Sequence, residues 1–366
     1  MSDETRTRPV REIRINPIVP TESVLVATAR GMRPKEEEKR LERDTRSVVA
    51  HCPFCRGNED RTPPAIAVYP ENGPWEVRIV PNLYPVLGDD TPGTSLSFGL
   101  QQVIDGYGRH EVVIDHWNHG IAVHQMSREH LTGLFGIYRR RMAELYAADP
   151  RLRYVLVFKN FGPAAGASIA HTHSQIIAMP VVPENVQNEV HHSHLYHGKY
   201  NQCVFCSLID EALTFEATIY DRESGEVRRR IDVGQYVIER NDHFVAIKPF
   251  ASRFEWEIQI LPLDHEADFL TTPEAHLDDL ADLFRRTMAR LDRVVGGVQY
   301  NFFLHSLPHG EEYAAHRDSY HWHLEICPRT SIPTGFELGS GLFVSTVSPE
   351  EAAQALREAD IDSLLD

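Results

Sequence analysis

The chain has 366 residues, enough for two domains or one duplicated unit, and its 42% hydrophobic and 25% charged residues are ordinary for a globular protein. Lys and Arg number 37 against 53 Asp and Glu, and the net charge of −16 excludes a general nucleic-acid-binding surface. No apolar run approaches the ~20 residues that span a bilayer, and the N-terminus lacks a signal-peptide core, so we expect a cytoplasmic protein with no membrane partner.

The first part of the chain predicts two strands, at 12–16 and 23–27, followed by a basic loop. Arg30 and Arg33 lie on either side of a glycine in this loop. They could clamp a phosphate, because guanidinium groups bind oxyanions through paired hydrogen bonds. A solvated loop is an equally good interpretation of these two arginines alone. Residues 36–46 are a run of charges, which is typical of a solvated loop.

A Cys-x-x-Cys motif comes next, at Cys52 and Cys55, and two thiolates at this spacing can bind one tetrahedral zinc ion. The chain has five cysteines, of which four form two such pairs. This usage fits metal binding in a reducing compartment better than disulfide bonding. An amphipathic helix at 127–148 is then predicted among strands at 77–80, 110–115 and 154–158.

A glycine-rich loop, residues 160–168, leads into a predicted strand with His171, His173 and Gln175 at alternate positions. Alternate side chains of a strand share one face, so these three would line a site. The small loop residues let backbone N–H groups approach a phosphate closely. A neutral imidazole is a good nucleophile toward a phosphoric anhydride, and the pattern therefore favours phosphorus chemistry. For an isolated His-x-His, a strand with two satisfied histidines would be the simpler interpretation.

The same order of features restarts after a polar connector at 184–200. A second Cys-x-x-Cys, at Cys203 and Cys206, is followed by strands, a helix opened by Thr272 and Pro273, and a second His-x-His segment. The predicted strands lie at 244–247, 256–261, 300–304 and 320–325, and the predicted helix at 272–295. This order predicts the same unit written twice.

The repeat assigns one set of four metal ligands to each half. The sets are Cys52, Cys55, His119 and His171, and then Cys203, Cys206, His265 and His321. Four protein ligands close a tetrahedron, so two structural zinc ions are expected. An alternative second site offers only nitrogen and oxygen ligands, which would suit iron or zinc but leave Cys203 and Cys206 without a role. Its members would be Glu189, His305, His321 and His323.

These motifs resemble the galactose-1-phosphate uridylyltransferase family of the histidine-triad superfamily, along nearly the whole chain. The matching segments are 30–34, 52–55, 81–85, 158–160, 166–168, 171–175, 321–323 and 334–337. The resemblance implies an α+β fold made of a duplicated histidine-triad-like unit, with two antiparallel-sheet half-barrels and packed helices. The two domains would be 1–190, which carries the nucleophile, and 191–366.

The resemblance also implies the roles of single residues. His173 would form a nucleotidyl-histidine, and Gln175 and Ser168 would contact the transferred phosphoryl group. Further substrate contacts are implied for Arg30, Arg33, Asn82, Asn160, Gly166, Phe336 and Glu337. The implied reaction moves UMP from UDP-glucose to galactose 1-phosphate or a related hexose 1-phosphate, in a homodimer.

Thr172 departs from the family, whose usual residue between the two histidines is proline. This segment and the second Cys-x-x-Cys look more like the nucleotide-sugar phosphorylase branch, so the alternative reaction is adenylyl transfer from ADP-glucose to phosphate. A third alternative is a nucleotide-binding or hydrolase-like module. Gln175 disfavours hydrolysis, because hydrolytic relatives have a histidine there that can protonate a leaving group.

Overall fold

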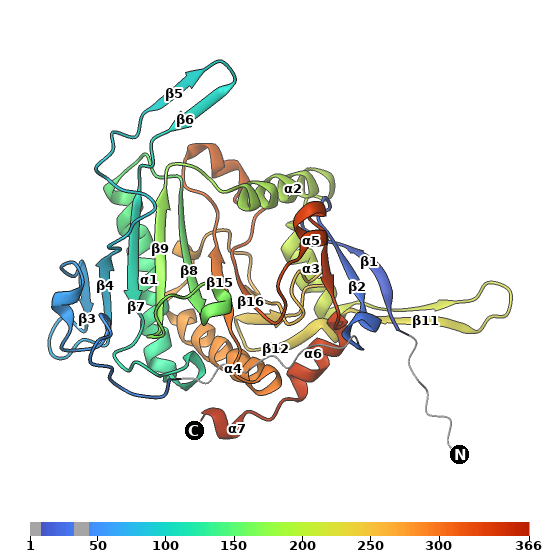
Figure 1. Ribbon diagram of the computed structural model, residues 1–366. Helices are drawn as coiled ribbons and strands as arrows, with labels where there is room; N and C mark the ends of the chain where they lie inside the picture. The colour runs from blue at the N-terminus through green and yellow to red at the C-terminus, as the bar shows by residue number, and fades with distance from the viewer. Residues whose placement is uncertain (1–8, 33–43, 366) are drawn as a thin grey trace.

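The structure is a computed structural model and describes residues 9–32 and 44–365. Ten antiparallel strands form its central sheet, in the order β12, β13, β14, β16, β15, β8, β9, β7, β4 and β3 (Figure 1). In chain order these strands are β3 (Ala67–Tyr69), β4 (Val77–Pro81), β7 (Arg109–Ile114), β8 (Tyr154–Phe161), β9 (His173–Met179), β12 (Val237–Arg240), β13 (Phe244–Ile247), β14 (Ile258–Pro262), β15 (Tyr300–His305) and β16 (His323–Pro328).

The two halves of this sheet have the same topology. In each half the fourth and fifth strands along the chain exchange places in the sheet, and a long helix connects the third strand to the fourth. These helices are α1 (Arg128–Ala148) and α4 (Leu277–Val295). The predicted duplicated α+β unit is therefore confirmed. The halves join where β8 pairs with β15, so that one sheet runs through both.

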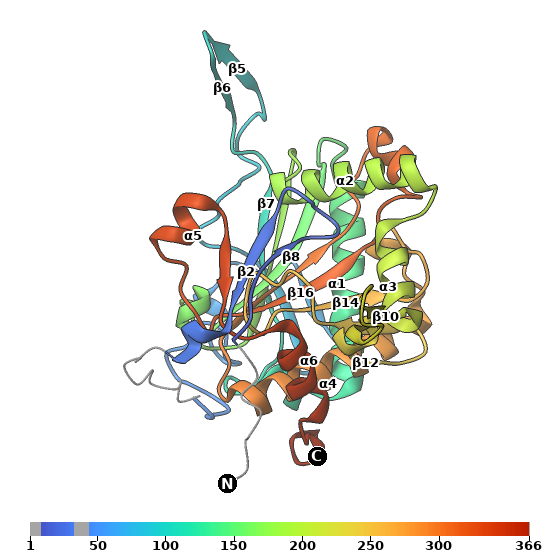
Figure 2. The same ribbon diagram turned by 90° about the vertical axis from the view of Figure 1, so that its right-hand side faces the viewer.

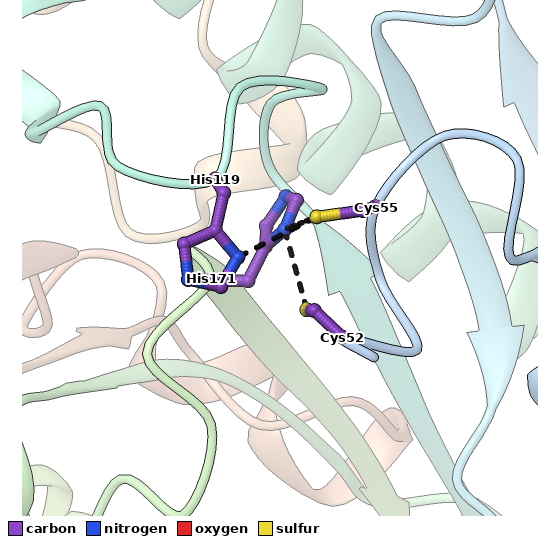
Figure 3. Close-up of side chains that lie close together, drawn as sticks. All are labelled: Cys52, Cys55, His119 and His171. Atoms are coloured by element: carbon purple, nitrogen blue, oxygen red, sulfur yellow. Dashed lines mark hydrogen bonds between the residues drawn. The ribbon is translucent and has the colours of Figure 1, made fainter. Parts of the chain in front are cut away.

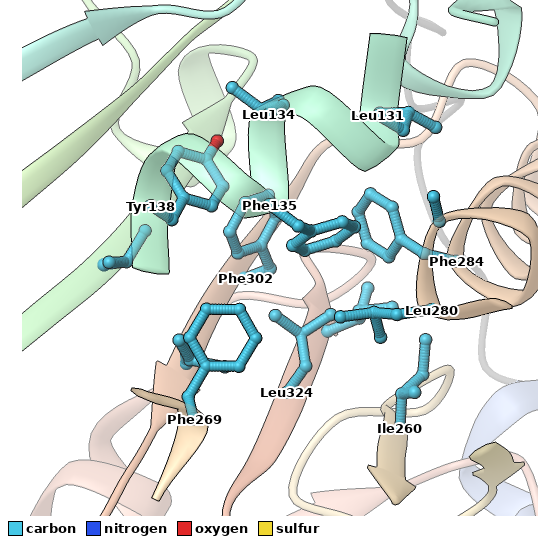
Figure 4. Close-up of a cluster of buried hydrophobic side chains, with 14 of the residues drawn as sticks. Leu131, Leu134, Phe135, Tyr138, Ile260, Phe269, Leu280, Phe284, Phe302 and Leu324 are labelled. Carbon is cyan, nitrogen blue, oxygen red and sulfur yellow. The ribbon is translucent and has the colours of Figure 1, made fainter. Parts of the chain in front are cut away.

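Helices α1 and α4 pack against each other and cover one face of the sheet (Figure 4). Helix α1 begins where predicted, because the Ser127 side chain accepts a hydrogen bond from the backbone N–H of His130. Apolar side chains recur on its inner face, and Phe135 meets Phe284 of α4 edge-on, with ring centroids 5.4 Å apart. Burial of these faces is the main force holding helices to sheet.

Helix α2 (Glu184–Tyr200) and helix α3 (Val204–Thr214) lie on the opposite face, over the second half of the sheet. The connector predicted at 184–200 is therefore a helix, polar and largely exposed as expected but with one buried side. Val186 and Val190 form a narrow apolar stripe at helical spacing that packs into the core, while histidines occupy much of the rest of the helix surface. The predicted domain boundary, which remains a prediction, falls inside this helix.

Smaller elements surround the central sheet. Strands β1 and β2 near the N-terminus form a three-stranded sheet with β17, which runs parallel to β2. Two hairpins, β5–β6 and β10–β11, extend from the body, as Figures 1 and 2 show. Their bounds and those of the last helices are β1 (Arg11–Ile15), β2 (Ser23–Ala27), β5 (Ser95–Phe98), β6 (Gln101–Ile104), β10 (Glu216–Tyr220), β11 (Val227–Asp232), α5 (Gly335–Ser340), β17 (Phe343–Ser345), α6 (Pro349–Glu358) and α7 (Asp362–Leu365). Among the described residues, no helix combines the length and apolarity needed to cross a bilayer.

Lys248 follows β13 and is fully buried, where its Nζ donates hydrogen bonds to the carbonyls of Phe254 (3.2 Å) and Glu257 (3.0 Å). Burial lowers the pKa of Lys248 to about 7 from an ordinary value of 10.5. Between these two values the unfolded chain holds a proton that the folded chain has released. The free energy of unfolding should therefore gain up to about 1.4 kcal/mol per pH unit from this group as pH rises from 7.

Lys248→Met should remove this component, since methionine does not titrate. Chemical denaturation of both proteins at pH 7, 8 and 9 measures it as the difference between two slopes, so that other titrating groups cancel. Equal slopes for the variant and the unaltered protein would contradict the assignment.

Candidate active site and metal clusters

The first predicted ligand set comes together as a buried cluster (Figure 3). The Sγ atom of Cys55 lies 3.5 Å from Nδ1 of both His119 and His171, and Cys52 Sγ lies 3.7 Å from His171 Nδ1. The potential ligand atoms all lie within 4.8 Å of one another. Two sulfur and two imidazole nitrogen atoms that converge in this way could hold one tetrahedral metal ion.

Groups around this cluster set the tautomer and the protonation state of its side chains. The second ring nitrogen of His171 donates to the His116 carbonyl at 2.8 Å, which leaves Nδ1 to face the thiols. Burial lowers the pKa of His171 to about 4, so this imidazole is neutral at pH 7, as a ligand must be. Burial also raises the pKa of Cys52 to about 11, and a bound cation would reverse that effect by stabilising the thiolate.

The second predicted set also comes together, closer to the surface. Cys206 Sγ lies 3.2 Å from His265 Nδ1 and 3.6 Å from His321 Nδ1. The outer ring nitrogens again donate to carbonyls, those of Arg317 and Pro262. A hydrogen bond from Cys206, followed by those from the two histidines, lowers the pKa of Cys203 to about 3. The repeat thus reproduces the cluster in both halves.

A third cluster resembles the alternative second set in all but one member. His305 Nδ1 lies 3.0 Å from Glu189, and His323 lies 3.8 Å from Glu189 and 3.7 Å from Glu325. His321 is not part of it, because its Nδ1 faces Cys206. The four groups Glu189, His305, His323 and Glu325 could also hold a metal ion. The alternative set was therefore wrong to place His321 here, because His321 lies with Cys203, Cys206 and His265.

His173 is the first residue of β9, and its side chain is only 7% exposed. Its Nδ1 donates to the carbonyl of His171 at 2.8 Å, so Nε2 keeps its lone pair. The Phe54 ring contacts it edge-on at 5.2 Å between centroids. Burial lowers the pKa of His173, and the charge of Lys159 lowers it further. The imidazole is thus neutral at pH 7, which suits a nucleophile.

Two amide side chains near His173 are oriented by partners that the sequence did not indicate. His110 accepts from the Val86 backbone N–H through Nδ1, so its Nε2 donates to the Gln175 oxygen at 2.8 Å. On β15, Asn301 donates to the Asn160 oxygen at 2.8 Å. Because both amide oxygens accept a hydrogen bond, both NH₂ groups are the ends left to donate to a ligand.

The glycine-rich loop is braced by the second half of the chain. Gln299 accepts a hydrogen bond from the backbone N–H of Ala164 at 2.7 Å, and Asn301 donates to the carbonyl of Ala165 at 2.8 Å. Gly162 has a φ of +87°, and a Cβ there would lie 2.5 Å from the Gln299 side chain, so only glycine fits. Gly166, also with positive φ, ends the short turn at 163–165, two residues before Ser168.

The other predicted substrate residues separate into two places. Asn82 lies beside the Gln175 side of the site, since its Nδ2 is 3.0 Å from the Nε2 of His110, the partner of Gln175. Arg30, Phe336 and Glu337 lie beside the β1–β2–β17 sheet, where Glu337 caps α5. The hydrogen bond from the Thr334 side chain lowers the pKa of Glu337, and the Arg30 charge lowers it further. In the described part of one chain, no hydrogen bond or ion pair joins that group to His173. Arg33 and most of the charged run at 36–46 lie outside the described residues.

Comparison with known proteins gives relatives along nearly the whole chain. The model of the family called "Domain of unknown function (DUF4931) N-terminal domain" matches residues 103–182, which include β7 to β9. The ADP-glucose phosphorylase of Arabidopsis thaliana is 29% identical over 353 residues, 96% of this chain and 93% of the relative. The galactose-1-phosphate uridylyltransferase of Thermotoga maritima is 25% identical over 359 residues, 96% and 99% of the two chains.

Comparison with solved structures gives proteins of the same kind. A crystal structure of the Arabidopsis thaliana ADP-glucose phosphorylase with bound ADP-glucose superposes with a TM-score of 0.77 at 28% identity, covering 96% of this chain and all of that one. A structure described as a uridylyltransferase, at 24% identity, has the same fold, with a TM-score of 0.69 over 97% of this chain and 100% of that one. The resemblance to the galactose-1-phosphate uridylyltransferase family, with its phosphorylase branch, is confirmed.

Proposed function

We propose that this relative of the galactose-1-phosphate uridylyltransferases is a nucleotidyltransferase that acts through a covalent nucleotidyl-histidine at His173. The observation that carries the proposal is the orientation of this imidazole. Its Nδ1 is committed to the His171 carbonyl, and its Nε2 lone pair remains for attack. Gln175 and Asn160 have their amide oxygens occupied, so their NH₂ groups are oriented to donate.

The reaction then needs two displacements at one phosphorus atom. His173 Nε2 attacks the α-phosphorus of a nucleotide sugar, the bond to the bridging oxygen breaks, and the sugar 1-phosphate leaves with the electron pair. A phosphate oxygen of the acceptor next attacks the same phosphorus, and the N–P electron pair returns to Nε2. Donors from Gln175, Asn160 and the loop would stabilise the phosphoryl oxygens, each by about 3 kcal/mol.

Two acceptors fit this scheme, and each has support. Transfer of UMP from UDP-glucose to galactose 1-phosphate is supported by the relative from Thermotoga maritima. Transfer of AMP from ADP-glucose to inorganic phosphate is supported by the relative from Arabidopsis thaliana, by Thr172 and by the second Cys-x-x-Cys. Both reactions exchange phosphate leaving groups, so an acid that protonates a poor leaving group is not required, and Gln175 suits either one.

An experiment that forms the covalent adduct first and adds the acceptor afterwards tests which of the two reactions takes place. The protein is first incubated with UDP-glucose or with ADP-glucose, without an acceptor, to form the adduct. Galactose 1-phosphate or inorganic phosphate is then added, and the adduct is followed by intact mass. We expect one of the two nucleotide sugars to transfer its nucleoside monophosphate to His173, and one of the two acceptors to remove it. If neither nucleotide sugar forms the adduct, the proposal itself is contradicted.

We also propose zinc at both Cys₂His₂ clusters, in a structural role. Four protein ligands leave no position for substrate, and two thiolates with two imidazoles favour zinc among the common divalent ions. Metal analysis of the purified protein should give two zinc ions per chain. One zinc with iron in place of the other would count against the second assignment.

The homodimer implied by the family resemblance stays a proposal. Light scattering on the purified protein, with and without nucleotide sugar, would measure the mass in solution. A mass of one chain under both conditions would contradict it.

A further inference from the structure

Lys159 lies in β8, after five aromatic or aliphatic residues and before Asn160, and is only 1% exposed. Its Nζ carries three hydrogen-bond donors, and each has an acceptor. They reach Asp115 Oδ2 at 2.6 Å, the Thr172 hydroxyl at 2.8 Å and the His173 carbonyl at 3.0 Å. Because all three donors are used inside the protein, none is left for a substrate.

The charge of this ammonium group is balanced where it lies. Asp115 is also 1% exposed, and besides Lys159 it accepts hydrogen bonds from the hydroxyls of Ser174 (3.0 Å) and Tyr138 (3.2 Å). A buried ion pair of this kind is a weak source of net stability, because desolvation offsets the attraction. A contribution to stability therefore does not explain why a charged pair is buried in contact with the His173 carbonyl.

We propose that Lys159 is a positioning residue for His173, an inference that rests on the proposed nucleotidyl transfer. Its hydrogen bonds to the Thr172 hydroxyl and to the His173 carbonyl hold the segment that carries the imidazole. The bond from His173 Nδ1 to the His171 carbonyl then fixes the ring on that backbone. Together these hydrogen bonds orient Nε2 for attack on the phosphorus atom. A displacement of a reacting group by about 1 Å can lower a rate about 100-fold.

Thr172 gives this arrangement a chemical reason. Its hydroxyl accepts the hydrogen bond from Lys159 at 2.8 Å and lies 3.5 Å from Asp115 Oδ2, to which it donates. The residue before His173 is therefore tied to both members of the buried ion pair.

Thr172→Val tests the inference, because valine keeps the shape of threonine and removes only the hydroxyl. Lys159 would keep its bonds to Asp115 and to the His173 carbonyl, so folding should survive. We expect kcat to fall 10- to 100-fold, with KM for the nucleotide sugar within about twofold of the unaltered protein. The rate of adduct formation in a single turnover should fall by the same factor. Thr172→Ser, which restores a hydroxyl, should recover most of kcat.

Thr272→Val is the matched control. Thr272 is as buried as Thr172, and its hydroxyl donates to a carboxylate oxygen of Glu266 at 2.6 Å, in the second half of the chain. It should lower stability to a similar extent and leave kcat unchanged. Metal content should stay at the unaltered level in all three variants.

The outcomes separate this inference from the proposed function. If the unaltered protein forms no adduct, the nucleotidyl-transfer proposal fails. If it forms the adduct and Thr172→Val reacts at the unaltered rate, or if Thr172→Ser is as slow as Thr172→Val, only the positioning role of Lys159 fails. A loss of kcat in Thr272→Val equal to that in Thr172→Val would reduce the effect to general destabilisation and would also overturn it.

Discussion

Replacing His173 with asparagine should lower turnover by several orders of magnitude while the protein stays folded and keeps its metals. Asparagine can donate to the His171 carbonyl as Nδ1 does, so the local hydrogen bond can persist. It has no nucleophilic lone pair, and the covalent route is closed. Loss of the covalent nucleophile of a serine protease lowers kcat about 10⁶-fold, which sets the scale of the expected effect.

Intact mass after incubation with a nucleotide sugar, without acceptor, measures this directly. The unaltered protein should gain one nucleoside monophosphate through an acid-labile N–P bond, and the His173→Asn variant none. Peptide mapping should place the group on His173 and not on His323, its counterpart in the repeat, which has the same Nδ1 bond to a neighbouring carbonyl, at 3.1 Å. His191→Asn, a change on the exposed side of α2, is the control that should still form the adduct. An adduct that survives His173→Asn would overturn the mechanism.

Replacing Cys55 with serine should cost a large part of the stability of the chain. Its sulfur lies 3.5 Å from both histidines of the first cluster. A structural zinc ion contributes about 10–16 kcal/mol to folding in small zinc-binding peptides, comparable with the about 5–15 kcal/mol that stabilises a whole domain. We expect either failure to fold or a melting temperature at least about 10 °C lower, together with loss of one zinc per chain.

Loss of the first cluster should also lower turnover, because His171 supplies the carbonyl that orients His173. Cys206→Ser in the second cluster should lower stability and zinc content with a smaller effect on kcat. Cys327→Ala removes the one cysteine outside both four-ligand sets and should keep two zinc ions. Metal analysis and thermal melting read out all three variants. A Cys55→Ser protein that holds two zinc ions and melts at the unaltered temperature would refute the structural role.

The motif spacing was enough to predict the duplication and both Cys₂His₂ clusters. Each cluster combines a short motif, Cys-x-x-Cys, with histidines at repeated separations, and the geometry of a metal site leaves few other ways to join them. We propose His173 as the nucleophile for a related reason, since His171 belongs to the first Cys₂His₂ cluster and His173 does not. In these cases a strong local constraint links the sequence to the structure.

The parts that sequence reasoning missed depend on contacts between distant strands. Asn301 and Gln299 brace the loop only because β15 pairs with β8, and strand periodicity does not tell which edges of two sheets will join. Lys159 did give a signal, as a lysine at the end of an apolar run in a strand, but its partners Asp115 and Thr172 lie on other segments. The alternative metal set failed at His321 because this residue precedes β16, which begins at His323, so the two side chains do not share a strand face. His321 faces Cys206, whereas His323 faces Glu189.

The junction of β8 with β15 also has a consequence for how the chain reaches its folded state. The hydrogen-bonded pair Asn160 and Asn301 is separated by 141 positions along the chain. Contacts of such high sequence separation form slowly, because a long loop must close before they stabilise anything. Until they form, each half presents a bare inner strand edge to the solvent. During synthesis the edge of β8 stays exposed until β15 has been made. In that interval β8 is most prone to pair with a wrong strand.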